Sequence, residues 1–438
     1  MGASLKYQNK IIAVYGMGLT GFSAARALKK VGAKVFCWDD DIKIRRKIKK
    51  KNFSLDKFWK NPNYIDQIVI SPGIDLNKCK IKSYLTKNLN KIITDLDLFF
   101  DFNKKCLIIS VTGTNGKSTT CKVIEKILKT AKYNVKTVGN IGKPILSLKQ
   151  TEKKSIIILE VSSYQLQYSN LFRSKHAAIL NISPDHLERH KYMNNYIKIK
   201  SKIFFAQKKS DYSYINTNNK YSKSIANIFR TKKLKSQLVK IDKYKHNLLI
   251  KKINNNYFKS AGNTENMTFA YKIAKNLKIK DKIIIKSLNK FKGLPHRQEI
   301  VFENKKLLCI NDSKATSFDA SFQSLSNFNN IYWIVGGMPK HQDRFYLKKV
   351  KVRIKKAYII GKNVSFFKKQ IKKNLIFSIS NNLKNAINHI YKDLKLDNDS
   401  KPTILFSPAA ASFDQFSNFE NRGNYFKNLI TKKFKKNT

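Results

Sequence analysis

Short apolar runs recur along the chain, and each is followed by a turn and a stretch with helical spacing. Clear examples are IIAVY at 11–15, IIILE at 156–160 and IYWIV at 331–335. These runs are apolar at successive positions instead of alternating, which is typical of strands buried on both faces of a parallel sheet. The pattern therefore predicts stacked α/β units.

The strand–turn–helix pattern starts again three times, which predicts three α/β domains. The starts are KIIAVYGMGLTG from Lys10, CLIISVTGTNGKSTT from Cys106 and LLCINDSKAT from Leu307. We expect a Rossmann-like N-terminal domain at 1–97, a central P-loop ATPase-like parallel-sheet domain at 98–294 and a Rossmann-like C-terminal domain at 295–438. The Lys- and Asn-rich segment at 217–258 is expected to be a long excursion or hairpins on the central domain.

The formal net charge of +60 raises the alternative of a nucleic-acid-binding protein, because clustered Lys and Arg displace counterions from phosphate polymers. The basic residues are instead spread along the whole chain among Asn and Ile, as an AT-rich coding sequence would produce. The 42% of hydrophobic residues is enough to build folded cores. We therefore expect a globular monomer with no nucleic-acid partner.

The cysteines and the N-terminus indicate a cytoplasmic protein. The five cysteines are odd in number, widely spaced and contain no CxxC pair, so neither a disulfide framework nor a zinc site is indicated. The segment MGASLKYQNK has no apolar core of a signal peptide, and no apolar run approaches the ~18 residues of a membrane-spanning helix. We expect no membrane insertion.

The most specific motif is TGTNGKST at 112–119, which follows a predicted strand and precedes a predicted helix. Glycines let such a loop turn its N–H groups toward an anion, and the helix N-terminus favours negative charge. A strict P-loop requires Gly at position 111, where Val111 stands. The pattern predicts an ATP phosphate site formed by Gly113, Thr114, Asn115, Gly116, Lys117, Ser118 and Thr119, with Ser118 placed to bind Mg²⁺.

Two further strand ends carry polar residues that suit a metal-assisted phosphate site. Glu160 ends the run IIILE, and Asp185 and His186 follow ILNISP. Ligands bind where the carboxyl ends of parallel strands meet, so these side chains should lie near the phosphate loop. His186 is a less usual magnesium ligand than an oxygen donor, so contact through water stays open.

The first domain contains a dinucleotide-type fingerprint, GMGLTG at 16–21, with Asp39 at the end of the next strand. Taken alone, this pattern predicts NAD and an oxidoreductase. The fingerprint, however, predicts only that a pyrophosphate group binds at a helix N-terminus, and a UDP-sugar contains the same group as NAD. Both ligands remain open on this evidence.

Taken together, TGTNGKST, GNIG at 139–142, EVSSYQL at 160–166 and NISPDHLERH at 181–190 resemble the Mur ligase family. The resemblance implies that two Mg²⁺ ions are held by Ser118, Glu160, His186 and a CO₂-carbamylated lysine, which the Tyr-x-x-x-Lys spacing from Tyr196 assigns to Lys200. Lys117, His186 and Lys200 are then the catalytic residues. It also implies a UDP-substrate site formed by Gly18, Leu19, Thr20, Gly21, Asp39, Ser71, Pro72, Gly73 and Asn140.

The last third of the chain resembles the family members that add D-glutamate, through GLPHR at 293–297, INDSKAT at 310–316, GGMPK at 336–340 and SPAAASFDQFSNFENRG at 407–423. By this resemblance Asn266, Arg297, Asp312 and Lys314 contact ATP, and Thr316, Lys340, Ser412 and Phe419 bind D-glutamate. The chain departs from the family pattern at Asp39-Asp40-Asp41, where Asp-Thr-Arg is common. It departs again at Phe269, where the pattern has Asn, and at Met338, where an acid is common.

The resemblance implies an ATP-dependent amide ligase of peptidoglycan precursor synthesis. It would join the L-alanine carboxylate of UDP-N-acetylmuramoyl-L-alanine to D-glutamate through an acyl phosphate, releasing ADP and phosphate. A related folylpolyglutamate synthase would lack the α/β domain that precedes the phosphate loop here. An NAD-dependent oxidoreductase and a basic nucleic-acid-binding protein remain as alternatives from other classes.

Overall fold

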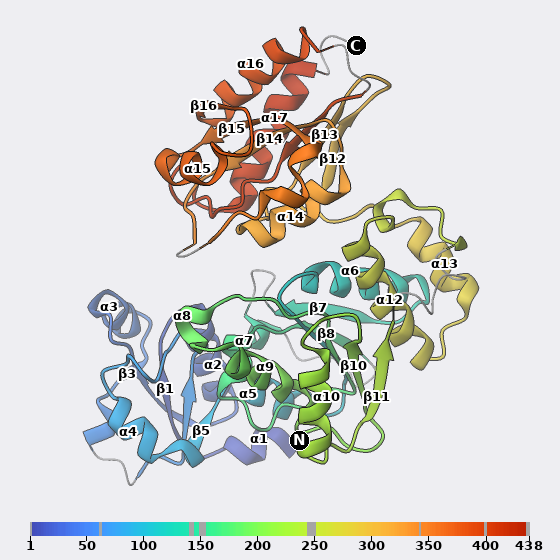
Figure 1. The fold of residues 1–438 in the computed structure, drawn as a ribbon. Coiled ribbons are helices and arrows are strands. Elements are labelled where there is room, and N and C mark those ends of the chain that lie inside the picture. The colour runs from blue at the N-terminus through green and yellow to red at the C-terminus, as the bar shows by residue number, and fades with distance from the viewer. Residues whose placement is uncertain are drawn as a thin grey trace. The chain divides into compact units, whose positions relative to one another are not determined.

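The computed structural model describes residues 2–60, 64–139, 144–148, 155–242, 251–340, 343–397 and 401–434. It contains three sheets with helices packed against them, in two compact units at 1–291 and 292–438 (Figure 1). Within these described ranges, no helix is both long and apolar enough to cross a membrane. The predicted class, α/β with three sheet-based domains, is confirmed.

The first sheet is fully parallel, with the strand order β3-β2-β1-β4-β5. Apolar side chains fill both of its faces, among them Val14 on one side and Ala13 on the other, which explains the continuous apolar run at this strand. Its strands are β1 (Ile11–Tyr15), β2 (Lys34–Trp38), β3 (Ser54–Leu55), β4 (Gln67–Ile70) and β5 (Ile92–Ile93). The helices around it are α1 (Gly2–Tyr7), α2 (Leu19–Lys30), α3 (Ile42–Lys50), α4 (Lys82–Lys87) and α5 (Asp95–Phe102), with short 3-10 helices η1 (Phe58–Lys60) and η3 (Leu89–Lys91).

The second sheet belongs to the same compact unit and is also parallel, in the order β11-β10-β9-β6-β8-β7. Its strands are β6 (Leu107–Thr112), β7 (Val135–Gly139), β8 (Ile156–Glu160), β9 (His176–Ile179), β10 (Tyr212–Asn216) and β11 (Gln237–Ile241). Its helices are α6 (Lys117–Thr130), α7 (Ser163–Gln167), α8 (Leu187–His190), α9 (Met193–Ser201), α10 (Ser222–Thr231), α12 (Ala261–Asn276) and α13 (Asp281–Asn289), with η4 (Ile145–Ser147), η5 (Lys202–Phe204) and η7 (Asn256–Phe258). Because β6 lies between β8 and β9, the segments after these three strands meet at one edge.

The expectation of an excursion or hairpins at 217–258 is wrong for its first part. α10 crosses back, and β11 pairs in parallel with β10 from Tyr212↔Gln237 to Asn216↔Ile241. This stretch therefore continues the α/β alternation. In the strand QLVKI, Gln237 and Lys240 are exposed and only Ile241 is buried, as an edge strand allows, so the strand lacks the continuous apolar run of the buried strands.

The second unit holds a sheet in the order β12-β13-β17-β14-β15-β16, in which β12 is antiparallel and the other strands are parallel. Its strands are β12 (Glu299–Glu303), β13 (Leu308–Asn311), β14 (Ile331–Gly336), β15 (Ile354–Ile360), β16 (Phe377–Asn381) and β17 (Thr403–Phe406). Its helices are α14 (Phe318–Asn327), α15 (Val364–Ile371), α16 (Leu383–Leu394) and α17 (Phe419–Phe434), with η8 (Leu347–Lys349) and η9 (Lys351–Arg353). Separate apolar clusters, one containing Trp333 and one containing Tyr358, fill the two faces of this sheet.

Candidate active site

The phosphate loop joins β6 to α6 and depends on two glycines for its shape. Gly113 has φ +152° and Gly116, which caps α6, has φ +83°. A Cβ atom at Gly116 would lie 2.2 Å from Oδ1 of Asn266, which comes from α12. These positions need glycine because the backbone angle and the close neighbour both exclude a side chain.

Asn181, in the segment after β9, holds the loop in place. Its carbonyl accepts a 2.9 Å hydrogen bond from the Thr114 amide, and its Oδ1 accepts one of 2.8 Å from the Asn115 amide. The Thr114 hydroxyl donates to the Ser183 carbonyl at 3.2 Å. The loop is thus held by the neighbouring strand end, a role that the sequence motif did not reveal for Asn181.

The predicted loop residues meet the predicted carboxylate. The Ser118 hydroxyl donates to Oε2 of Glu160 at 2.6 Å, and Glu160 is 3% exposed at the end of β8. The Lys117 ammonium donates to the Gly113 and Thr114 carbonyls at 2.9 and 2.8 Å. A cation, a hydroxyl and a carboxylate therefore lie around one loop, as the strand-end argument predicted.

Lys200 reaches the same loop from α9. Its side chain is buried, and Nζ donates to the Gly113 carbonyl at 2.9 Å and to Oγ1 of Thr112 at 3.3 Å. Burial lowers the pKa of this amine well below its usual value, and Lys117 lowers it further, while nearby Asp185 and Glu160 act in the opposite direction. The structure therefore favours a neutral amine at this position.

His186 lies at the start of α8 in a left-handed conformation, with φ +55°. Its Nδ1 is 3.0 Å from the Tyr164 hydroxyl, and its Nε2 is 3.4 Å from Oδ2 of Asp185. The nearby His190 is buried, and burial lowers its pKa to about 4, so it stays neutral near pH 7. His186 is therefore the more accessible of the two imidazoles.

The oxygen donors at the loop fit a hard cation such as Mg²⁺, since Ser118 and Glu160 present a hydroxyl and a carboxylate side by side. An unmodified Lys200 amine adds no such donor. Across the described part of the chain, no group of three or more His, Cys, Asp or Glu side chains is arranged to hold a metal. A metal here would have to use the hydroxyl and other oxygen donors.

The glycine-rich turn of the first sheet is tightly packed. A Cβ atom at Gly21 would lie 2.0 Å from the Gly16 carbonyl oxygen, and the Ser71 hydroxyl donates to that same oxygen at 2.5 Å. Oδ2 of Asp39 accepts from the Met17 amide at 2.6 Å, and Oδ1 accepts from the Asp41 amide at 2.9 Å. Asp39 therefore supports the turn through the backbone.

Other residues predicted for the UDP-substrate site lie around this turn. Gly18 caps α2 and has open space where a Cβ would be, and Leu19 and Thr20 begin the helix, with Leu19 79% exposed. Pro72 and Gly73 follow Ser71 after β4. Asn140, also predicted for this site, lies outside the described residues.

Arg189 links the segment after β4 to the central sheet and was not predicted. Its guanidinium donates to the carbonyls of Pro72, Gly73 and Ile74, at 3.5 Å to Pro72 and 3.4 Å to Gly73. Its Nε donates to Oε1 of Gln167 at 2.8 Å. The sequence feature that could have indicated a role for Arg189 is its position in DHLER, three residues after His186.

In the second unit, Asp312 is a buried carboxylate rather than an exposed ligand group. Oδ2 accepts from the hydroxyls of Ser324 and Ser407 at 2.6 and 2.8 Å, and Oδ1 accepts from the Gln298 amide at 3.2 Å. Burial raises its pKa to about 6, while these donors and the charge of Arg297 oppose the shift. Asp312 thus joins the segment before β12 to α14 and to the segment after β17. Its predicted contact with ATP stays a prediction.

The segments that carry the other predicted residues meet at the carboxyl ends of β13, β14 and β17. The Lys314 ammonium lies 3.6 Å from the centroid of the Phe419 ring, and Met338 and Ala411 exchange two backbone hydrogen bonds of 2.9 Å. The Met338 pair brings together the segments that contain Lys340, which is exposed, and Ser412, which is buried. Thr316 is half-buried between β13 and α14.

Arg422 is a further residue that the sequence argument missed. It is 1% exposed on α17, and its guanidinium donates to the carbonyls of Ser313 and Ala410 at 2.8 and 2.9 Å. It therefore ties the segments after β13 and β17 together. At the family departure in α12, Phe269 is fully buried, so it packs in the core and offers no contact to a ligand.

This arrangement agrees with the comparisons with known proteins. The chain belongs to the Mur ligase family, whose members are ATP-dependent amide ligases, and residues 111–284 match the Mur ligase middle domain. It is 38% identical to the UDP-N-acetylmuramoylalanine–D-glutamate ligase of Rickettsia felis, over 95% of this chain and 96% of that protein. It is 32% identical to the enzyme of the same name from Wolbachia pipientis wMel, over 96% of each chain.

Solved structures support the same fold. The MurF ligase of Thermotoga maritima, determined in complex with ADP, aligns with a TM-score of 0.56 and 13% identity over 98% of this chain and 97% of that chain. MurF from Acinetobacter baumannii aligns with a TM-score of 0.56 and 14% identity over 84% and 86%. Membership of this family supports an ATP-dependent amide ligase over the oxidoreductase and nucleic-acid-binding alternatives, and the ligand of the GMGLTG turn stays a prediction.

Proposed function

We propose that the protein joins D-glutamate to UDP-N-acetylmuramoyl-L-alanine in an ATP-dependent reaction of peptidoglycan precursor synthesis. The observation that carries this proposal is the convergence of Lys117, Ser118, Glu160 and Lys200 on one phosphate loop, in a chain that matches D-glutamate ligases over nearly its whole length. The domains would then be 1–97 for the UDP-substrate, 98–294 for ATP and 295–438 for the amino acid.

The reaction has two steps. An oxygen of the L-alanine carboxylate attacks the γ-phosphorus of ATP, the bond to the β,γ-bridging oxygen breaks, and ADP leaves. The D-glutamate amine then attacks the acyl-phosphate carbonyl, phosphate is expelled with the C–O electron pair, and the amine loses a proton. Transfer of this kind depends on positioning and charge neutralisation, which the Lys117 ammonium and the N–H groups of the loop supply.

Lys200 is the residue we assign to carbamylation. A neutral amine adds to CO₂ to give a carbamate after loss of a proton, and burial beside Lys117 favours the neutral amine. The product is a carboxylate-like group that adds two oxygen donors to Ser118 and Glu160, with His186 at the next strand end. Two Mg²⁺ ions bound by these residues would neutralise charge on the transferred phosphoryl group.

The remaining assignments place the other substrates. Gly18, Leu19, Thr20 and Gly21 would hold the diphosphate of the UDP-substrate at the start of α2, with Asp39, Ser71, Pro72, Gly73 and Asn140 completing that site. Asn266, Arg297, Asp312 and Lys314 would contact ATP. D-Glutamate carries two carboxylates, which Lys340 can pair with, while Thr316 and Ser412 donate hydrogen bonds and Phe419 closes the pocket.

The cysteines support a reducing compartment, since all five are free thiols. We therefore place the enzyme in the cytoplasm, where its small-molecule substrates would be available. We also propose that it acts as a monomer, which light scattering at working concentration would test.

The experiment that tests the function measures ADP release with the UDP-muramoyl-alanine acceptor and one of four amino acids: D-glutamate, L-glutamate, L-alanine or diaminopimelate. We expect turnover with D-glutamate alone. Lys117→Ala should lower the rate by about 10³-fold or more, because a charge on the transferred phosphoryl group loses its partner. Lys126→Ala, an exposed position on the same helix, is the matched control. Unchanged turnover in Lys117→Ala would refute the proposal.

A further inference from the structure

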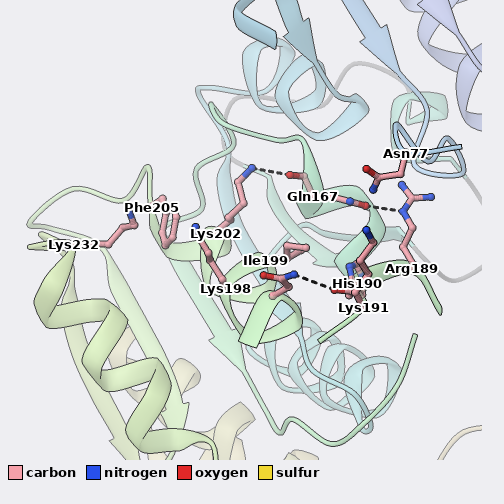
Figure 2. Close-up of a pocket in the computed structure, with 11 residues that line it drawn as sticks. Asn77, Gln167, Arg189, His190, Lys191, Lys198, Ile199, Lys202, Phe205 and Lys232 are labelled. Carbon is pink, nitrogen blue, oxygen red and sulfur yellow. Dashed lines mark hydrogen bonds between the residues drawn. The ribbon is translucent and has the colours of Figure 1, made fainter. Parts of the chain in front are cut away.

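A cavity of about 450 Å³ lies beside α9, and its walls come from α8, α9, η5 and the ends of α7 and α10 (Figure 2). Lys200 points from α9 to the phosphate loop, whereas Lys198 and Lys202, two positions to either side, line the cavity. Two residues along a helix correspond to a rotation of about 200°. The cavity is therefore on the side of α9 that faces away from the phosphate loop.

The charged residues that line this cavity are all basic or imidazole groups. The cations are Arg189, Lys191, Lys198, Lys202 and Lys232, and none of the described lining residues is acidic. In the parts of the chain that the structure describes, none of these four lysines forms an ion pair with a carboxylate. By contrast, Lys122 and Lys129 on α6 both pair with Glu125. The cavity lining thus concentrates positive charge with no acidic side chain among the described lining residues.

Lys202 is partly removed from solvent in the wall of this cavity. It is half-buried, and its Nζ donates to the Gln167 carbonyl at 2.9 Å (Figure 2). Lys198 lines the same cavity. A bound anion would offset both the desolvation of Lys202 and the repulsion between the two ammonium groups.

The cavity also has the other properties of a small-molecule site. Its volume lies in the range of about 300–1,000 Å³ that such sites occupy. Asn77 and Asn195 add amide donors, and Phe205 and Ile199 form an apolar wall, with the Lys232 ammonium 5.7 Å from the centroid of the Phe205 ring. Lysines occur throughout this chain, and this group is set apart by its concave arrangement, in which none of the described lining residues is acidic.

We propose that this cavity binds a small molecule carrying two or more phosphate groups, at a site separate from the phosphate loop. One wall contributes Arg189, whose guanidinium also holds the carbonyls of Pro72, Gly73 and Ile74. An occupant is therefore in a position to stabilise the segment after β4. The proposal does not depend on the amide-ligase reaction.

Calorimetric titration of the full-length protein with inorganic triphosphate tests this site. Because triphosphate could also bind the phosphate loop, the titration is made in the Lys117→Ala protein as well as in the unmutated one. We expect the double variant Lys198→Ala, Lys202→Met to bind triphosphate at least about tenfold more weakly in the Lys117→Ala background, since two charge-assisted contacts are lost. Met keeps the packing of the half-buried Lys202 stem.

The matched control removes the same charge elsewhere in the first unit, at the exposed helix positions Lys223 and Lys282, and should change the affinity by less than about twofold. If both double variants bound triphosphate equally weakly, the overall positive charge of the protein would explain the lost affinity, and the proposal would be overturned. Complete loss of binding on Lys117→Ala alone would also overturn it. If the cavity double variant fails to fold, Lys232→Glu at an exposed position should still weaken binding about fivefold, and unchanged affinity would overturn the proposal.

Discussion

Lys200 is a residue at which catalysis and stability are expected to oppose one another. Lys200 is 2% exposed and the pKa of its amine is lowered by burial, so the folded state disfavours the ammonium that the unfolded chain carries at pH 7. The lowered pKa therefore reduces the free energy of unfolding. This loss of stability becomes smaller as the pH rises toward about 10.4, the pKa of a lysine in the unfolded chain, and larger as the pH falls.

We therefore expect Lys200→Met to stabilise the protein by about 1 kcal/mol at pH 7 in CO₂-depleted buffer, while abolishing ligase activity. Chemical denaturation and the ADP-release assay measure the two effects. The gain should shrink between pH 7 and pH 10. A less stable variant at every pH would show that the hydrogen bonds of Lys200 to Thr112 and Gly113 outweigh its desolvation.

At the scale of single residues, the sequence was informative where chemistry comes with a motif. The convergence of Ser118 and Glu160 on one loop follows from the motif and from strand ends that meet at one edge, whereas Lys200 was assigned by the resemblance to the Mur ligase family. Asn181 and Arg189 were missed because they bind backbone groups, and nearly every residue has the same backbone groups, so the sequence does not indicate which of them are bound. The ligand roles of the predicted residues stay predictions.

Helix α8 is a short element that one arginine joins to the segment after β4. Arg189 makes several hydrogen bonds in a fixed planar geometry to the segment after β4, which a lysine cannot reproduce. We expect Arg189→Lys to raise KM for the UDP-substrate about tenfold and to leave KM for ATP within about twofold, because that segment carries the predicted substrate contacts Ser71, Pro72 and Gly73. Steady-state kinetics with each substrate varied separately measures this.

Arg173→Lys is the control for that variant. Arg173 makes a similar two-pronged contact, to Asp211 at 2.7 and 3.0 Å, in the same unit. It should lower stability without changing KM for the UDP-substrate. Equal KM changes in both variants would indicate a general loss of packing.

At the scale of elements, buried parallel strands were predictable and edge strands were not. Runs such as Ile156–Glu160 are covered on both faces, so every position is apolar except the last. β11 and the antiparallel β12 lie at sheet edges, where partial exposure permits polar residues and the apolar pattern disappears. The crossover through α10 into β11 was therefore read as an irregular segment.

At the scale of the whole molecule, the two units have separate cores. The clusters of the second unit draw their residues from 301–434, and helices and strands of that unit cover both faces of its sheet. We expect the fragment 292–438 to fold alone, with a mixed α/β circular dichroism spectrum and one cooperative thermal transition. The complementary fragment 1–291 is the control for expression and handling. A disordered spectrum for 292–438 would contradict the prediction.

The overall charge was the least informative property of the sequence. A net charge of +60 suggested nucleic acid, yet the chain belongs to a family of ligases that act on small molecules. The net charge comes from lysines spread over the chain. We expect these lysines to attract anions most strongly where a concave surface has no acidic lining residue, as in the described part of the cavity beside α9.

The carbonyl oxygen of Gly113 is shared by two amines, Lys117 and Lys200, at 2.9 Å each. A triphosphate that drew Lys117 outward would leave that oxygen to Lys200 alone, which would hold the amine in place. If the amine became a carbamate, as we propose, its negative charge would repel the same carbonyl oxygen, and only Lys117 could donate to it. The order in which carbon dioxide and nucleotide arrive should then affect how quickly freshly prepared enzyme becomes competent, through a single peptide group.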